Sequence, residues 1–271
     1  MYKDYFRLRE EPFNITPDPR FLYLTAQHRE AMNHLLYGIR ERKGFICLTG
    51  EVGAGKTTLC RALLNHLEPK YHSALILNPV LSNTQMILAI LEEFGVRSRK
   101  DDGRLGYLRL LNKFLLRVNA AGDDAILIID EAQDMPVKAL EMIRLLSNLE
   151  TERQKLLQIV LVGQPELRVK LAKPCLRQLS QRITVRFHLN RMTREETSDY
   201  LKHRLQIAGA QGWPRFDRKA VREIHKFSGG TPRLVNAIGD KSLLAGYVYH
   251  TGDIGSRIVR RAVRELKGAG R

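Results

Sequence analysis

The stretch GEVGAGKTTL, residues 50–59, follows directly on the apolar run GFICLT at residues 44–49. Its first eight residues fit the pattern G-x-x-x-x-G-K-[ST], in which glycines let backbone N–H groups converge on phosphate oxygens. We expect Lys56 to place its charge on the β- and γ-phosphates and Thr57 to offer its hydroxyl to Mg²⁺. A helix predicted from about Lys56 adds its positive N-terminal end. The predicted phosphate-binding residues are Gly50, Glu51, Val52, Gly53, Ala54, Gly55, Lys56, Thr57 and Thr58.

A second motif, AILIIDEAQD, ends a short apolar run with two acidic residues, Asp130 and Glu131. Ligands of open α/β sheets bind at the carboxyl ends of strands, where these carboxylates are expected. Asp130 is suited to hold Mg²⁺, and Glu131 to orient and deprotonate an attacking water. A strand-end Asp-Glu that merely starts a turn is the alternative, but the glycine-rich loop upstream favours nucleotide hydrolysis.

A third polar residue, Gln164, ends the apolar run in LQIVLVGQPELR. We expect its amide near the γ-phosphate, where it would position water by hydrogen bonding. A turn residue before Pro165 is the alternative interpretation.

The order of apolar and helical patterns predicts an α/β domain. Apolar runs at 45–49, 74–77, 125–130, 157–162 and 183–189 alternate with helical patterns, which is typical of a parallel sheet with helical crossovers. From about residue 190 only helices are predicted: one capped by Thr193 and Glu196, then others near 217–227, 232–248 and 254–267. The expected organisation is an N-terminal strap (1–24, with Pro12, Pro17 and Pro19), a nucleotide-binding domain (25–190) and a small all-helical lid (191–271).

Composition indicates a cytoplasmic protein with an anionic partner. Among 271 residues, 45 Lys and Arg face 29 Asp and Glu, a net charge of +16 that attracts nucleic acid, acidic membrane surfaces or acidic proteins. No apolar run approaches the roughly 18–20 residues that span a bilayer, and the N-terminus lacks the apolar core of a signal peptide. The three cysteines, Cys47, Cys60 and Cys175, show no metal-ligand spacing, so neither disulfides nor a metal cluster are expected.

The strongest positive patch lies near the C-terminus. Arg257, Arg260, Arg261 and Arg264 follow helical spacing and are expected to share one face that could bind DNA phosphates without sequence preference. A solvated lid face is the alternative. A charged loop, RSRKDDGR at 97–104, adds further basic residues, partly offset by its two aspartates.

Several phrases together resemble AAA+ ATPases, and most closely the ExeA/GspA family of secretion and pilus-assembly ATPases. They include PFNITPDPRFLY, GFICLTGEVGAGKTTL, LIIDEAQDM, IVLVGQPELR, LRQLSQRITVRFHL and SGGTPRLVN, and they extend from about residue 2 to 240. The same core is more loosely similar to transposition regulators of the TnsC, TniB and MuB type.

The resemblance implies a role for each matching residue. GEVGAGKT corresponds to Walker A, LIIDE to Walker B with Asp130 for magnesium and Glu131 as base, and GQPEL to sensor 1 at Gln164. LRQLSQR corresponds to the box with the arginine finger, for which Arg182 is the first choice and Arg177 the second. GGTPR corresponds to sensor 2 with Arg233. Surface ion pairs are the alternative role for these arginines.

The resemblance also implies ATP, Mg²⁺ and self-assembly into a ring or filament. Longer secretion members carry a transmembrane segment and a peptidoglycan-binding domain after the core. Neither occurs in these 271 residues, so an envelope role is expected to run through an inner-membrane secretion or pilus protein. The alternative function is a DNA-bound ATPase that regulates transposition. A non-hydrolysing scaffold is disfavoured because Glu131 and a candidate finger are both present.

Overall fold

The computed structural model describes residues 1–14, 18–99, 102–150 and 154–268, which form two compact units. The first, the sheet unit, comprises residues 28–50 and 60–189. The second, the helical unit, comprises residues 1–27, 51–59 and the chain from residue 190 onward. Each unit is described by itself. Of the residues singled out in the sequence, Pro17, Lys100 and Asp101 lie outside the described ranges.

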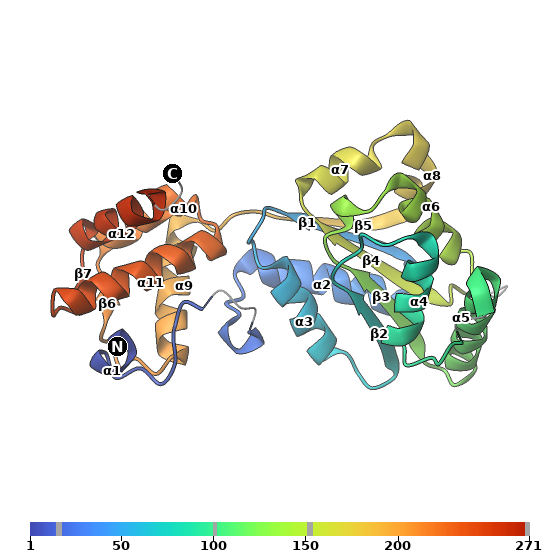
Figure 1. The fold of residues 1–271 in the computed structure, drawn as a ribbon, viewed down its shortest axis with the longest axis horizontal. Coiled ribbons are helices and arrows are strands. Elements are labelled where there is room, and N and C mark those ends of the chain that lie inside the picture. Colours follow the sequence, from blue (N-terminus) through green and yellow to red (C-terminus); the bar gives the residue numbers. More distant parts are fainter. Residues whose placement is uncertain (15–17, 100–101, 151–153, 269–271) are drawn as a thin grey trace. The chain divides into compact units, whose positions relative to one another are not determined.

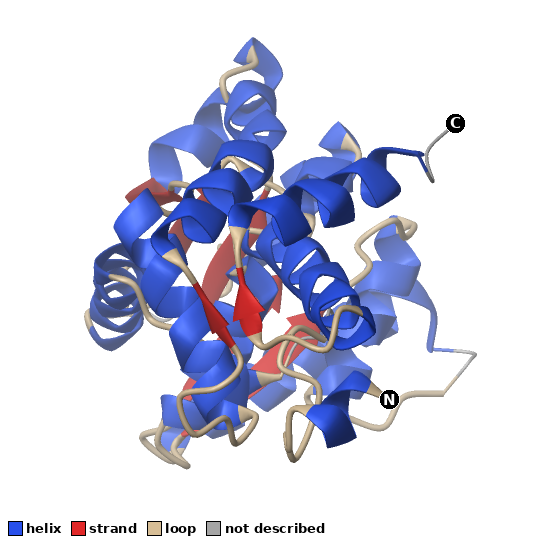
Figure 2. Ribbon diagram, turned by 90° about the vertical axis from the view of Figure 1, so that its left-hand side faces the viewer, coloured by secondary structure: helices blue, strands red, loops and turns tan. Residues whose placement is uncertain are grey.

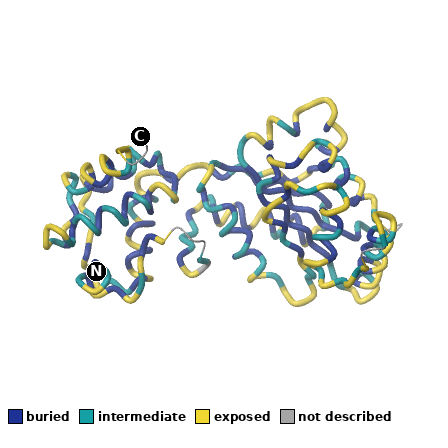
Figure 3. Tube along the Cα trace, in the orientation of Figure 1, coloured by how far each residue is buried: buried dark blue, intermediate teal, exposed yellow. Residues whose placement is uncertain are grey.

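Five parallel strands form the sheet, in the order β2-β3-β4-β1-β5 (Figure 1). The central strands are apolar and buried on both faces, as Figure 3 shows, because helices cover both sides of such sheets. In the parallel register Thr49 lies beside Gly163, and Ile129 beside Leu161, so three strands end at one edge. The strands are β1 (Phe45–Gly50), β2 (Tyr71–Ile76), β3 (Asp124–Ile129), β4 (Leu157–Gly163) and β5 (Ile183–Leu189).

The helices of the sheet unit pack on both faces of the sheet. Residues from α4 to α8 join alternate strand residues in one large apolar cluster. On the other face α2 lies close to the sheet, because a Cβ at Gly38 would meet the Ile46 side chain at 2.6 Å. The elements are α2 (Ala26–Arg40), α3 (Lys56–His66), α4 (Asn83–Glu93), α5 (Gly103–Ala120), η3 (Ala132–Asp134), α6 (Val137–Leu146), α7 (Pro165–Leu171), η4 (Pro174–Leu176) and α8 (Arg177–Arg182).

The helical unit has its own apolar core, to which the N-terminal segment contributes. Phe6, Phe13 and Phe21 are buried in the same cluster as residues of the four long helices. Figure 2 shows these helices around two short strands. The elements are α1 (Tyr2–Tyr5), η1 (Pro19–Phe21), α9 (Arg194–Ile207), β6 (Arg215–Phe216), α10 (Arg218–Ser228), α11 (Pro232–Val248), β7 (Asp253–Ile254) and α12 (Ser256–Gly268).

The sequence predicted the fold class and all five strands of the sheet, with local errors. Strand β2 starts at residue 71 rather than 74, because it is an edge strand whose first residues are partly exposed and not apolar. The helical unit is not entirely helical: β6 and β7 pair over two residues, too few to produce a periodic pattern. The prediction of a charged loop at 97–104 is wrong at its C-terminal end, because α5 begins at Gly103. Glycine has a low helix propensity, so the local pattern gives little sign of a helix start there.

Candidate functional site

The carboxyl edge of the sheet carries the predicted acidic pair. Asp130 follows β3 directly and is 2% exposed. Its Oδ1 accepts the backbone N–H of Glu131 at 2.9 Å. Glu131 adopts a left-handed backbone conformation with φ +50° and ψ +36°, which is costly for a residue with a side chain. Such strain is typical of functional sites, and here it sets the direction in which the glutamate leaves the strand.

Glu131 and Gln164 are brought together at this edge. The Gln164 Nε2 atom donates to Glu131 Oε2 at 3.1 Å, across the edge between β3 and β4. Gln164 is also the N-cap of α7, with Pro165 at the first helical position. The turn interpretation is therefore correct for its backbone, while its side chain contacts the predicted base.

Two further side chains hold this pair, and sequence reasoning missed both. Gln133 donates from Nε2 to Glu131 Oε2 at 2.7 Å and accepts the Gln164 backbone N–H at Oε1 at 3.0 Å. Lys170, on α7, donates from Nζ to the backbone oxygens of Gln133 and Met135. The available signal was the amide two residues after the glutamate in DEAQD. Nothing in its local pattern indicates a contact 31 residues away.

The glycine-rich loop, residues 51–59 of the helical unit, has the geometry of a phosphate cradle. Gly53 and Gly55 have φ of +74° and +94°, values that glycine adopts without strain. Helix α3 starts at Lys56, so the positive end of its dipole lies at the loop. Lys56 is buried at 5% exposure, and its Nζ donates to the Glu51 backbone oxygen at 3.0 Å. Thr57 occupies the next position of the same helix.

Arg233 lies beside this loop within the helical unit. Pro232 opens α11, as predicted, and the Arg233 backbone N–H donates to the Gly53 oxygen at 3.4 Å. A Cβ at Gly53 would lie 2.6 Å from the Cβ of Arg233, so only glycine fits there. Another arginine that sequence reasoning missed, Arg191, forms an ion pair with Glu51 of the loop at 3.3 Å.

The two finger candidates lie on α8 and differ in their contacts. Arg182 Nη1 donates to Ser147 Oγ at 2.7 Å and Asn148 Oδ1 at 2.6 Å, next to the last turn of α6. All its contacts are neutral, so its charge is not balanced by a carboxylate within the described residues. Arg177, at the start of α8, is exposed. These contacts fit the capping of α6 as well as a finger.

The basic residues that line one hollow near the C-terminus differ by one from the predicted set. Lys267, rather than Arg261, completes a hollow of about 370 Å³. Arg261 instead pairs with Glu265 at 3.3 Å and contacts the Tyr249 hydroxyl. In the described part of the chain, no carboxylate forms an ion pair with the four basic residues of this hollow. We call it the basic hollow; it is lined by Phe227, Arg257, Arg260, Val263, Arg264 and Lys267.

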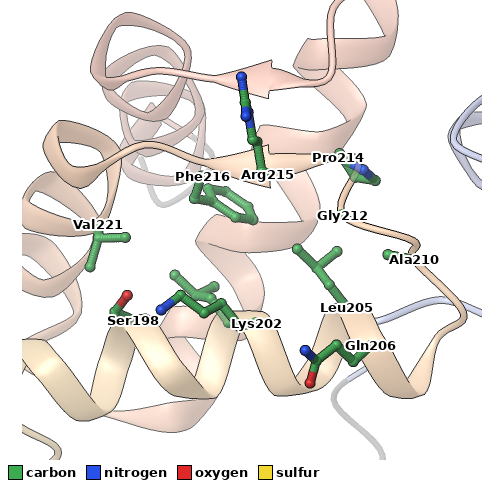
Figure 4. Close-up of a pocket in the computed structure, with 11 residues that line it drawn as sticks. Ser198, Lys202, Leu205, Gln206, Ala210, Gly212, Pro214, Arg215, Phe216 and Val221 are labelled. Carbon is green, nitrogen blue, oxygen red and sulfur yellow. The ribbon is translucent and has the colours of Figure 1, made fainter.

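A second hollow in the helical unit, of about 410 Å³, lies between α9 and β6 (Figure 4). Leu205 and Phe216 point into it from opposite sides, whereas Arg215 points away. Arg215 pairs with Asp253 at 2.6 Å, and Lys202 pairs with Asp199 at 3.2 Å. The hollow is therefore apolar inside, and each basic residue at its rim is paired with an aspartate, which distinguishes it from the basic hollow.

Two further features of the described residues concern membranes and metals. Their helices include none of sufficient length and apolarity to cross a bilayer. Their His, Cys, Asp and Glu side chains also form no group of three that could hold a metal ion.

The class of protein follows from this fold, this site and its relatives. Residues 39–171 match the family described as AAA domain. Cdc6p of Pyrobaculum aerophilum has a similar fold, with a TM-score of 0.72, 18% identity, and coverage of 91% of this chain and 70% of that one. The ORC2 protein of Aeropyrum pernix, in ADPNP–ADP complexes, has a TM-score of 0.71 and 16% identity, with coverage of 94% of this chain and 71% of that one. Residues 39–171 thus resemble an AAA domain, and the chain shares the fold of these two solved proteins.

In sequence the chain is also similar to general secretion pathway protein A. It is 44% identical to this protein of Aeromonas hydrophila over 268 residues, which are 99% of this chain and 49% of the relative. The chain thus spans about half the length of that relative. The identity supports the secretion interpretation over the transposition interpretation.

Proposed function

We propose that this chain binds ATP with Mg²⁺ and hydrolyses it to drive or regulate assembly of a secretion or type IV pilus-type envelope machine. The observation that carries hydrolysis is the Glu131 carboxylate, held by the Gln164 amide at 3.1 Å at the carboxyl edge of the sheet. A nucleotide-binding scaffold needs a phosphate cradle alone. Activation of a water requires a base held in position beside it, and a glutamate oriented by amides is suited to that role.

The proposed roles follow the chemistry of each group. Gly50, Glu51, Val52, Gly53, Ala54, Gly55 and Thr58 supply the loop around the phosphates, and Lys56 neutralises phosphate charge. Glu131 takes the proton of the water that attacks the γ-phosphorus, while the bond to the ADP oxygen breaks. Gln164 orients that water. Arg233 stabilises negative charge on the γ-phosphoryl group.

The residues present fit Mg²⁺, which prefers oxygen ligands and keeps several waters. The Thr57 hydroxyl and the buried Asp130 carboxylate would hold the ion together with phosphate oxygens. When bound, Mg²⁺ neutralises the charge that develops on the transferred phosphoryl group. Asp130 is already fixed by its contact with the Glu131 N–H, so little side-chain entropy remains to be lost.

Two substitutions test the hydrolysis proposal. Lys56→Ala should weaken ATP binding, because one positive charge on the phosphates is lost. Glu131→Gln should bind ATP normally and retain it, because only the base is removed and positioned bases contribute about 10²–10⁴-fold in rate. Equilibrium binding of a fluorescent ATP analogue and single-turnover hydrolysis measure both effects. Unchanged turnover in Glu131→Gln would contradict the proposed role of this residue.

We also propose that activity depends on self-assembly into a ring or filament, with Arg182 acting on the neighbouring subunit's nucleotide and Arg177 as the second candidate. An arginine finger supplied in trans contributes about 10³–10⁵ in rate in related hydrolases. Specific activity should therefore rise with protein concentration. Mixing Arg182→Ala with Glu131→Gln subunits should restore part of the hydrolysis that each lacks, and a monomer with concentration-independent activity would refute the proposal.

The proposed partner is an inner-membrane secretion or pilus protein, which would hold this chain at the cytoplasmic face of that membrane. The proposal rests on the 44% identity with general secretion pathway protein A and on the net charge of +16. Cross-linking in cells with the ATP-retaining Glu131→Gln variant should recover such a protein. ATP-stimulated binding to duplex DNA through the basic hollow would favour the transposition alternative instead.

A further inference from the structure

The side-chain amide of Gln133 is buried, and both of its donor hydrogens are engaged. The residue is 8% exposed. Its Nε2 donates to Glu131 Oε2 at 2.7 Å and to Asp134 Oδ2 at 3.1 Å, and its Oε1 accepts the Gln164 N–H at 3.0 Å. Because an amide group has two donor hydrogens and one acceptor oxygen, no donor is left unused. A buried amide with every donor engaged has one stable orientation.

This amide closes a ring of contacts at the edge between β3 and β4. Gln133 contacts the side chain of Glu131 and the backbone of Gln164, and the Gln164 side chain contacts the same Glu131 oxygen. The proposed base and the proposed water-orienting amide therefore cannot reorient independently. Both amides donate to Oε2, which leaves Oε1 as the oxygen to accept a proton from water.

The surroundings hold the amide in place from two further sides. Lys170 Nζ donates to the backbone oxygens of Gln133 and Met135. A Cβ at Gly163 would lie 2.8 Å from Gln133 Oε1, so the glycine at the end of β4 leaves the room that the amide needs. The left-handed backbone of Glu131 requires such external support, because strained conformations persist only where neighbours fix them.

We infer that Gln133 is a positioning residue for ATP hydrolysis: it fixes the orientation of Glu131 and couples it to Gln164. The inference rests on the proposed hydrolytic function. Gln133 acts through Glu131 and Gln164, so it governs the rate of the chemical step and not the affinity for nucleotide.

Gln133→Met tests the inference, since methionine has a similar length and no amide. The kcat should fall about 10- to 100-fold, the order of loss expected when a catalytic group is displaced by about 1 Å. The dissociation constant for ATP, measured by titration of a fluorescent analogue, should stay within about twofold.

Gln158 offers a matched control within β4. It is a buried amide, 1% exposed, whose Oε1 accepts the Gly44 N–H at 2.8 Å. Gln158→Met should lower stability without separating kcat from ATP affinity. If Gln158→Met reproduced the effects of Gln133→Met, the role of Gln133 would be merely structural and the inference would be overturned.

The outcomes separate this inference from the function on which it rests. A wild-type chain that binds ATP but shows no turnover at any concentration refutes the proposed function. A wild-type chain whose turnover rate Gln133→Met matches refutes the inference alone. If Gln133→Met fails to fold, Gln133→Asn keeps the amide and shortens its reach. Its kcat should then fall while ATP binding persists, and an unchanged kcat would again refute the inference.

Discussion

Arg204 should anchor the N-terminal segment to the helical unit, and its removal should cost stability there. The side chain is 7% exposed on α9. Its Nε donates to the Pro12 oxygen at 2.5 Å and its Nη2 to the Asn14 oxygen at 2.9 Å. The guanidinium also lies 4.5 Å from the centroid of the Phe21 ring. One arginine therefore contacts three points of a segment that precedes it by nearly two hundred residues.

The magnitude follows from these contacts. Hydrogen bonds from a charged donor contribute about 1.5–3 kcal/mol each, so two give about 3 kcal/mol at the low end. Stacking of a cation on an aromatic ring adds about 0.5–1 kcal/mol. Burial disfavours this charge and so lowers the pKa of the guanidinium, and its removal in Arg204→Ala therefore offsets part of the loss. We expect a net loss of about 2–4 kcal/mol in the free energy of unfolding of the helical unit.

The assay can use the chain's single tryptophan, Trp213. Its ring lies 5.0 Å from that of Phe6 and 5.6 Å from that of Tyr5, so its fluorescence reports the docking of the N-terminal segment. Urea unfolding followed by this fluorescence should show an earlier midpoint in Arg204→Ala. Arg194→Ala, on the same helix but at an exposed ion pair, should change stability by less than about 0.5 kcal/mol. A loss below about 1 kcal/mol in Arg204→Ala would refute the anchoring argument.

Three further outcomes are expected. In the native protein a thiol reagent should modify only the exposed Cys175. Burial raises the pKa of Cys47 to about 11, and Cys60 is buried as well. Reaction of all three cysteines without denaturant would contradict this prediction. Burial lowers the pKa of His203, so its contribution to stability should be complete above about pH 6.5 and should fall as the pH decreases below that value. In urea titrations from pH 8 to 5, a His203→Phe variant should lose this pH dependence of stability. Charge reversal by Arg260→Glu with Arg264→Glu should weaken the salt-dependent binding of any polyanion to the basic hollow. Filter binding at several salt concentrations measures this effect, and an unchanged affinity would mean that the hollow is only a solvated surface.

The sequence predicted those parts of the fold and site that depend on local pattern. β1 was evident because a strand covered on both faces is continuously apolar, and α9 because Thr193 and Glu196 form the expected capping box. The two motifs indicated where the glycine-rich loop and Asp130 lie along the fold. These features need only neighbours within a few residues, so a single sequence contains them.

The parts that the sequence did not predict depend on contacts between distant segments. Gln133 meets Gln164 only because the sheet order places β4 next to β3, and α7 then brings Lys170 over the same turn. Arg261 shares helical spacing with its basic neighbours, but the nearby Tyr249 and a local carboxylate draw it to another contact. Helical periodicity gives a direction for a side chain and not the partner that lies there.

The close contact between Gly163 and Gln133 has an evolutionary consequence. Any side chain at position 163 would occupy the space of the amide oxygen at position 133, and would also meet Leu167 at 2.9 Å. A side chain at position 163 would therefore displace the Gln133 amide, and with it the contacts that hold Glu131. Among related chains that keep an amide at position 133, position 163 should remain glycine, whereas a chain without that amide is released from its contact with the amide oxygen. Covariation of this kind, a glycine at 163 wherever an amide stands at 133, would mark the contact in related sequences.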